Sequence, residues 1–252
     1  MKSKRFYRVI VVGPTGSGKS QFCNFVQRDT SNSINEGGDL LDSCTQEPKS
    51  NIFLRNEIKY EFIDTPGNSD SSNNDDKNLE VLVNYLKKKD EIDYILLLLK
   101  FNERITYNTR KYLETLGKIF TPLEFYTHLS IFFTKFPNNP TKKEKEIKLK
   151  SIKEINNILK NIFELKKNTP LPDINVYFID TEYDEIKKTY EEVFQETIDI
   201  MMEKMKLDVD IYGSINTKNL DVFGNNVKIR NENHKKEIEK LEKLLKEEKL
   251  RK

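Results

Sequence analysis

The stretch Ile10-Val11-Val12-Gly13-Pro14-Thr15-Gly16-Ser17-Gly18-Lys19-Ser20 decides the fold, because an apolar run leads directly into a glycine-rich octapeptide. Residues 13–20 match the pattern G-x-x-x-x-G-K-[ST], and residues 21–26 continue with helical periodicity. Glycines allow backbone N–H groups to converge on phosphate oxygens at a helix N-terminus. The stretch therefore predicts a strand, a phosphate-binding loop and a helix. A chance glycine-rich turn is the poorer explanation, because all three parts agree.

Individual residues of this loop have expected tasks. The Lys19 ammonium group should reach the β and γ phosphates, and the Ser20 hydroxyl should ligate Mg²⁺. The residues expected to contact a bound nucleotide here are Gly13, Thr15, Gly16, Ser17, Gly18, Lys19, Ser20 and Gln21. The loop alone does not separate kinases, ATPases and GTPases, so a second motif is needed.

That second motif is Asp64-Thr65-Pro66-Gly67, which follows an apolar strand. An Asp at the tip of a strand beside a phosphate loop commonly contacts the metal, so Asp64 is expected to contact Mg²⁺ and nucleotide. Gly67 lacks a Cβ, and its N–H can therefore approach the γ phosphate and respond to its loss. The polar segment 68–78 should be a mobile switch loop. Together the two motifs favour a guanine-nucleotide switch.

Thr45 lies between these motifs, in a second loop expected over residues 30–48. A Thr at this position can bind Mg²⁺ and the γ phosphate through its hydroxyl and backbone, which orders the loop only in the triphosphate state. Position, rather than residue type, makes Thr45 a predicted metal ligand and catalytic residue.

Short β-branched and aromatic runs alternate with helical patterns along the chain, which predicts an α/β fold with helices on both faces of a mostly parallel sheet. A hairpin at residues 55–57 predicts one antiparallel edge. The expected strands are 8–12, 51–54, 59–63, 94–99, 131–134 and 176–179, and the expected helices are 19–28, 79–88, 106–120, 143–165 and 185–205.

We expect one nucleotide-binding domain over residues 1–206, followed by an extension over residues 207–252. The extension ends in a charged helix from His234, where Ile238, Leu241 and Leu245 have coiled-coil spacing. Barely two heptads are too few for a stable coiled coil alone. A solvated tail is therefore favoured over a pairing or docking helix.

The composition of the chain indicates which kinds of partner and which cellular compartment to expect. The 43 Lys and Arg nearly cancel the 41 Asp and Glu, leaving a net charge of +2, so no nucleic acid partner is expected. Two cysteines and the absence of an apolar signal or spanning stretch indicate a cytoplasmic protein. The basic residues of the terminal helix allow peripheral membrane contact, although its apolar stripe is narrow.

These motifs resemble the AIG or GIMAP family of immunity-associated GTPases, relatives of septins and of the Toc import GTPases. The resemblance also includes S-x-T at residues 43–45, the box at residues 104–111 and Phe133-Thr134-Lys135, and it runs to about Met205. It implies a three-layer P-loop GTPase domain that binds GTP or GDP with Mg²⁺ and forms a homodimer across the nucleotide face. Lys135 would stack on the base, and Arg104 would supply charge in trans. An exposed Arg after a strand is the alternative for Arg104.

Two positions depart from the pattern. Pro137 stands where GTPases have an Asp that binds guanine, and Asp180 is the candidate substitute, with a strand-end cap as its alternative. Asn68 stands where Ras-like enzymes have a Gln, so slow hydrolysis by the monomer is predicted. A nucleotide-binding scaffold with little turnover is the first alternative function. A small-molecule kinase is the second, but no acceptor site or Arg-bearing lid is evident.

Overall fold

The computed structural model describes most of the domain. It covers residues 6–28, 47–67, 75–101, 103–117, 119–135, 141–165, 172–179 and 188–220, together with Lys236, Glu239, Lys240 and Lys243. The loops that the sequence places around the nucleotide are therefore described in part.

The core is a six-stranded sheet with the strand order β2-β3-β1-β5-β6-β7. Neighbouring strands are parallel except β2 and β3, which form an antiparallel hairpin, so the predicted antiparallel edge is confirmed. The strands are β1 (Phe6–Val12), β2 (Lys49–Arg55), β3 (Ile58–Asp64), β5 (Tyr94–Lys100), β6 (Leu129–Thr134) and β7 (Asn175–Phe178).

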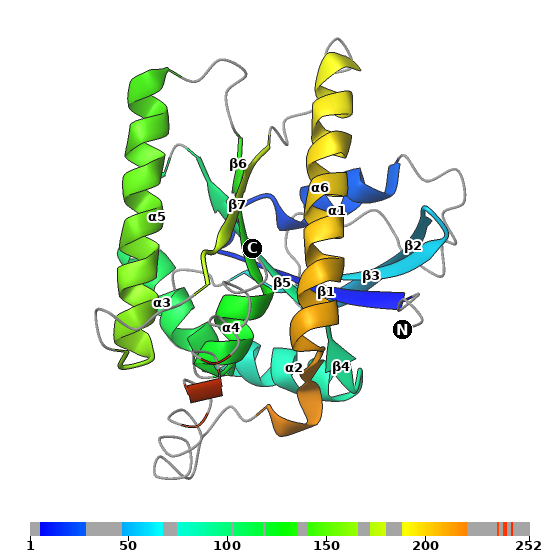
Figure 1. Ribbon diagram of the computed structural model, residues 1–252, viewed down its shortest axis with the longest axis vertical. Helices are drawn as coiled ribbons and strands as arrows, with labels where there is room; N and C mark the ends of the chain where they lie inside the picture. Colours follow the sequence, from blue (N-terminus) through cyan, green and yellow to red (C-terminus); the bar gives the residue numbers. More distant parts are fainter. Residues whose placement is uncertain are drawn as a thin grey trace.

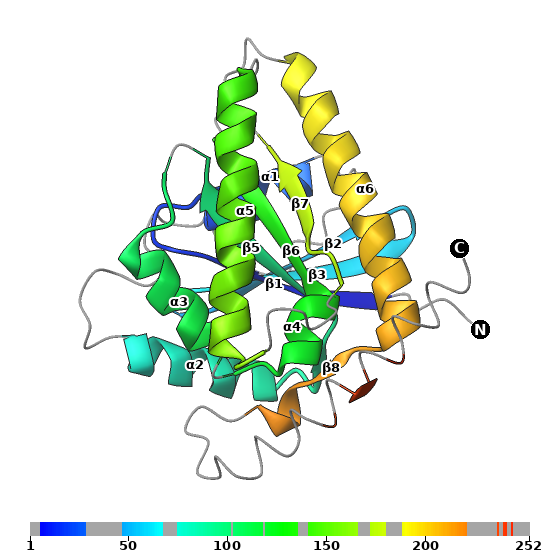
Figure 2. The same ribbon diagram turned by 60° about the vertical axis from the view of Figure 1, so that its left-hand side comes forward.

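Helices cover both faces of this sheet, as the α/β prediction requires (Figure 1). Helices α1 (Lys19–Arg28) and α6 (Lys188–Tyr212) pack on the face that carries Val9 and Val11. The opposite face, with Ile10 and Val12, packs against α2 (Asp75–Lys87), α3 (Tyr107–Gly117) and α5 (Lys142–Ile162). Figure 2 shows α2, α3 and α5 on one side and α6 on the other. The three-layer architecture is therefore confirmed.

The helix expected over residues 106–120 is shorter in the structure, because α3 ends at Gly117. A further short helix, α4 (Pro122–His128), which was not predicted, begins after Thr121. The Thr121 hydroxyl accepts from the N–H of Glu124, whose carboxylate accepts from the N–H of Thr121. This capping box starts a new helix. Similarly, α2 begins at Asp75, so the end of the segment expected as a loop is helical.

The last helix also differs from its prediction, since α6 continues to Tyr212 instead of ending near Met205. Strand β8 (Ile215–Asn216) then pairs with β4 (Glu91–Ile92), followed by a 3-10 turn (Thr217–Asn219). Ile215 and Leu220 belong to the hydrophobic core. The segment up to Leu220 thus packs on the domain, while the division of the chain after residue 206 stays a prediction.

His128 connects this C-terminal segment to α4. Its Nε2 lies 2.7 Å from the carbonyl oxygen of Gly213, and its side chain is buried. His128 is therefore a buried residue that packs α4 against the segment after α6.

The apolar stripe expected on the terminal helix remains a prediction. Lys236, Glu239, Lys240 and Lys243 are helical and exposed, but Ile238, Leu241 and Leu245 lie outside the described residues. Within the described part of the chain, every helix is too short or too polar to span a bilayer.

Candidate functional site

The phosphate-binding loop joins the carboxyl end of β1 to α1, as predicted. Gly16 and Gly18 adopt φ angles of 76° and 88°, in the left-handed region that glycine enters most readily. The N–H of Ser17 donates to the carbonyl oxygen of Pro14 at 3.1 Å, which closes the turn. Because the loop ends at the first turn of α1, its N–H groups lie at a helix N-terminus, where anions bind.

Lys19 lies under this loop and is 7% exposed. Its Nζ donates to the carbonyl oxygens of Gly13 at 2.9 Å and Pro14 at 3.1 Å. Burial lowers the pKa of Lys19 to about 8, against the opposing effect of the Asp64 carboxylate. Two carbonyl oxygens thus hold the ammonium group at the loop, but they do not fully offset the cost of burying its positive charge. An anionic ligand would offset that cost, so the site favours one.

The two expected Mg²⁺ ligands in the described region lie together. The Ser20 hydroxyl donates to Oδ2 of Asp64 at 2.6 Å, and Asp64 is fully buried. A hydroxyl and a carboxylate are hard oxygen donors, and Mg²⁺ in nucleotide sites uses one or two such groups plus phosphate and water. The described residues contain no cluster of three or more His, Cys, Asp or Glu. The donor set therefore fits Mg²⁺ that shares its coordination with a nucleotide.

The Asp64–Gly67 motif packs directly on the phosphate-binding loop. A Cβ at Gly67 would lie 2.6 Å from Oγ1 and 2.8 Å from Cα of Thr15, which no real side chain could tolerate. The hydroxyl of Thr65 donates to the carbonyl oxygen of Val11 at 2.8 Å and ties the motif to β1. Glycine is thus required at position 67 by close approach of the two loops.

Residues at the end of β6 support the loop from the other side. The Thr134 hydroxyl is fully buried and donates to the carbonyl oxygen of Ser17 at 2.8 Å. Lys135 follows with a φ of 56°, so the chain turns sharply as it leaves the strand. The sequence placed Lys135 at the base but assigned no role to Thr134, although T-K at a strand end was the available signal.

Tyr112 is a second residue that contacts the phosphate-binding loop and that the sequence did not indicate. Its hydroxyl accepts the N–H of Gly13 at 3.1 Å, and its side chain is buried. The two residues are 99 positions apart, so no local pattern could have indicated this contact.

Arg104 lies beside the loop rather than in it. It is exposed and lines a pocket between the phosphate-binding loop and the segment after β5. The other lining residues are Pro14, Thr15, Ser17, Leu99, Lys100, Glu103, Ile105, Thr109 and Phe133. Arg104 therefore sits where it could meet a partner on the nucleotide face. Thr15 and Gln21 are also exposed.

Several predicted positions lie outside the described residues. These are Thr45, Asn68, Pro137 and Asp180. The structure thus brings together Lys19, Ser20, Asp64 and Gly67, and leaves the remaining assignments as predictions.

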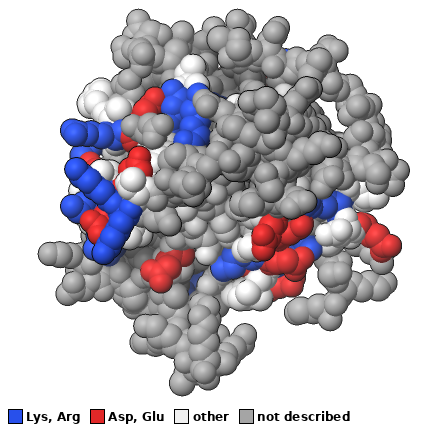
Figure 3. All heavy atoms as spheres, turned by 90° about the horizontal axis from the view of Figure 1, so that it is seen from above, with Lys and Arg blue, Asp and Glu red and all other residues white. Residues whose placement is uncertain are grey.

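Charge on the described surface is mixed in the view from above. Lys and Arg side chains lie near Asp and Glu side chains in two groups at opposite sides of the visible face (Figure 3). Lys19 adds a buried positive charge at the phosphate-binding loop itself.

Comparison with known proteins agrees with this arrangement. The model of the AIG1 family matches residues 7–198. The fold is similar to Toc33 from Arabidopsis thaliana in complex with GDP and Mg²⁺, with a TM-score of 0.64 and 14% identity over 84% of this chain and 88% of that one. Toc33 from the same plant with Mg²⁺ and GMPPNP gives a TM-score of 0.56 and 15% identity over 79% and 86% of the two chains. No curated protein matches the sequence.

A further solved structure with the same fold concerns the chloroplast translocon components atToc33 and psToc159, for whose GTPase activity dimerisation is described as important. It has a TM-score of 0.56 and 14% identity over 81% of this chain and 83% of that one. At this identity the likeness establishes the fold.

Proposed function

Because the chain belongs to the AIG1 family, we propose that it is a guanine-nucleotide switch that hydrolyses GTP to GDP and phosphate. The observation that carries the proposal is the convergence of Ser20, Asp64 and Gly67 on one phosphate-binding loop. Such a convergence places a metal site and a γ-phosphate sensor at the same anion site.

In hydrolysis, water adds to the γ phosphorus, and the bond between that phosphorus and the β–γ bridging oxygen breaks. We assign a task in this reaction to Lys19, Ser20, Asp64 and Gly67. The Lys19 ammonium neutralises charge on the β and γ phosphates. Ser20 and Asp64 would hold Mg²⁺, which when bound neutralises phosphate charge. Loss of the γ phosphate would remove the ligand that the Gly67 N–H contacts, and so release the Asp64–Gly67 loop. Thr45 is proposed to respond in the same way from the other switch loop.

Recognition of the base rests on fewer groups. Lys135 is proposed to stack on guanine, and Asp180 to accept from it in place of the carboxylate that Pro137 lacks. The solved Toc33 structures contain GDP and GMPPNP, both guanine nucleotides, which supports the choice of base. Displacement of a labelled GDP analogue by GTP but not by ATP is the expected result, and equal displacement by ATP would remove the guanine assignment.

We propose that dimerisation across the nucleotide face controls the rate. Arg104 is exposed beside the loop, on the side where a second subunit would approach the phosphates. Specific GTP turnover should rise with protein concentration, and Arg104→Ala should abolish that rise. Arg110→Ala is the matched control, because Arg110 is an exposed arginine on α3 that pairs with Glu154.

Phosphate release under multiple turnover tests the function itself. Wild-type protein should release phosphate from GTP with Mg²⁺, and Lys19→Ala should not. A scaffold that binds nucleotide without turning it over is the alternative. It would show GDP and GTP binding, loss of binding in Lys19→Ala, and phosphate release no faster than that of Lys19→Ala.

A further inference from the structure

A buried tyrosine on α3 contacts the phosphate-binding loop. The N–H of Gly13 donates to the Tyr112 hydroxyl at 3.1 Å, although the two residues are 99 positions apart. A side chain of α3 thus holds the first peptide N–H of the loop.

The phenol can accept this hydrogen bond in its neutral form. Tyr112 is 4% exposed, and burial raises its pKa to about 12, while the hydrogen bond from Gly13 acts in the opposite direction. The oxygen of a neutral hydroxyl has lone pairs that accept a hydrogen bond. Phenylalanine would leave a buried N–H donor at Gly13 without its partner.

Gly13 is the residue through which this contact reaches the phosphates. Its N–H is held by Tyr112, and its carbonyl oxygen accepts from Nζ of Lys19 at 2.9 Å. A Cβ at Gly13 would lie 2.3 Å from the carbonyl oxygen of Leu98, so the residue is confined between β5 and α3. Any change in the Gly13 peptide therefore moves an acceptor of the Lys19 ammonium group.

We propose that Tyr112 is a positioning residue of the nucleotide site, whose hydroxyl fixes Gly13 and thereby couples α3 to the phosphate-binding loop. It acts through Gly13 on Lys19. Helix α3 begins at Tyr107, which is 77% exposed beside Arg104. The same helix thus has one end at the surface of the nucleotide face and a buried hydroxyl at the loops. The effect on nucleotide affinity rests on the proposed function.

The test uses the full-length chain and two tyrosine substitutions. Tyr112→Phe removes the coupling hydroxyl. Tyr126→Phe is the matched control, because Tyr126 is a buried tyrosine whose hydroxyl has no hydrogen-bond partner among the described residues. Tyr112→Phe leaves the buried N–H of Gly13 without its acceptor, which lowers the population of the loop conformation that binds nucleotide. The dissociation constant for GDP should therefore rise about tenfold in this variant. It should stay within about twofold of wild type in Tyr126→Phe.

Hydrogen exchange in nucleotide-free protein gives a readout that does not depend on function. Tyr112→Phe should exchange faster than wild type in peptides covering residues 13–19, and Tyr126→Phe should not. A variant with a lower melting temperature but unchanged exchange in these peptides would show a purely structural role and overturn the proposal. If wild type failed to bind GDP, the proposed function would fail, while the exchange result would still decide the role of Tyr112.

Discussion

The Ser20 hydroxyl donates to Oδ2 of Asp64 at 2.6 Å, although the two residues are 44 positions apart. The contact joins two residues that the sequence predicts as Mg²⁺ ligands. Ser20 lies in the first turn of α1, and Asp64 is the last residue of β3. Because Asp64 is fully buried, its carboxylate needs either this hydroxyl or a cation to offset the cost of burial. We propose that a divalent ion, when bound, would take the place of this hydrogen bond as the partner of the carboxylate.

Ser20→Ala should weaken GDP binding about tenfold or more when Mg²⁺ is present, because a metal ligand is lost. In EDTA the variant and wild type should differ little, since no metal bond remains to be removed. Titration of a fluorescent GDP analogue in both buffers measures the difference. Ser151→Ala is the control, because the Ser151 hydroxyl donates to the carbonyl oxygen of Ile147 within α5. Equal losses with and without Mg²⁺ would contradict the metal assignment.

Thr134→Val should raise the dissociation constant for GDP about fivefold, because the bond that supports the Ser17 carbonyl is removed while the side-chain volume is kept. Thr134→Ser keeps the hydroxyl and should bind like wild type. If both variants weakened binding equally, packing of the threonine methyl group, rather than support of the loop, would explain the effect.

Local patterns predicted the fold and the position of the phosphate-binding loop well, because strand, loop and helix signals are contiguous in the sequence. Helix α1 follows the loop as expected, and the hairpin of β2 and β3 has its turn where Asn56 and Glu57 adopt positive φ. Helix α4 was missed although Thr121 and Glu124 form a local capping signal. Its seven residues are too few to show a clear helical periodicity.

Contacts between distant residues were not predictable in the same way. Thr134 reaches Ser17 across 117 positions, and Tyr112 reaches Gly13 across 99. Threonine and tyrosine are common in buried strands and helices, so neither residue type signals such a role. Only the order of strands in the sheet brings the end of β6 and the face of α3 to the same loop.

GDP affinity should fall above pH 8. Burial lowers the pKa of Lys19 from 10.5 to about 8 in the nucleotide-free protein, whereas bound phosphates favour the charged amine. Binding therefore takes up a proton once Lys19 starts to lose it, and the dissociation constant should rise about eightfold between pH 7.5 and 9. Titrations at constant ionic strength measure this. In Lys19→Ala, binding should be weak and nearly independent of pH over the same interval.

The lowered pKa of Lys19 also predicts how the free energy of unfolding depends on pH. The folded, nucleotide-free protein binds fewer protons than the unfolded chain between pH 8 and 10.5, so the depressed pKa of Lys19 should make stability rise with pH in that window. Below pH 8 the full cost of burying the charged amine is present. Denaturant unfolding of wild type minus Lys19→Ala should show this rise, and a flat difference would contradict the shifted pKa.

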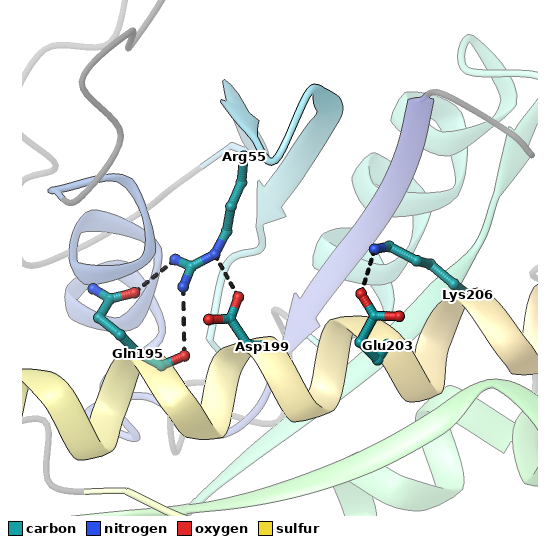
Figure 4. Close-up of polar contacts among 5 residues, drawn as sticks. All are labelled: Arg55, Gln195, Asp199, Glu203 and Lys206. Atoms are coloured by element: carbon teal, nitrogen blue, oxygen red, sulfur yellow. Dashed lines mark hydrogen bonds and ion pairs between the residues drawn. The ribbon is translucent and has the colours of Figure 1, made fainter.

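Arg55, the last residue of β2, connects the turn of the hairpin of β2 and β3 to α6 (Figure 4). Its guanidinium group donates to Oε1 of Gln195 at 2.6 Å and to Oδ1 of Asp199 at 2.8 Å, and the Arg55 side chain is only 10% exposed. Arg55→Met should lower the free energy of unfolding by about 1–2 kcal/mol, because bonds from a charged, mostly buried donor are lost.

Lys206→Met supplies the control on the same helix. Lys206 pairs with Glu203, which is 72% exposed, so water screens the pair and its loss should change stability by less than about 0.5 kcal/mol. Urea unfolding of both variants at neutral pH measures the contrast, and Figure 4 shows the two pairs along α6. Equal effects would mean that the Arg55 contacts are no stronger than a surface ion pair, and that the hairpin is held to α6 by apolar packing alone.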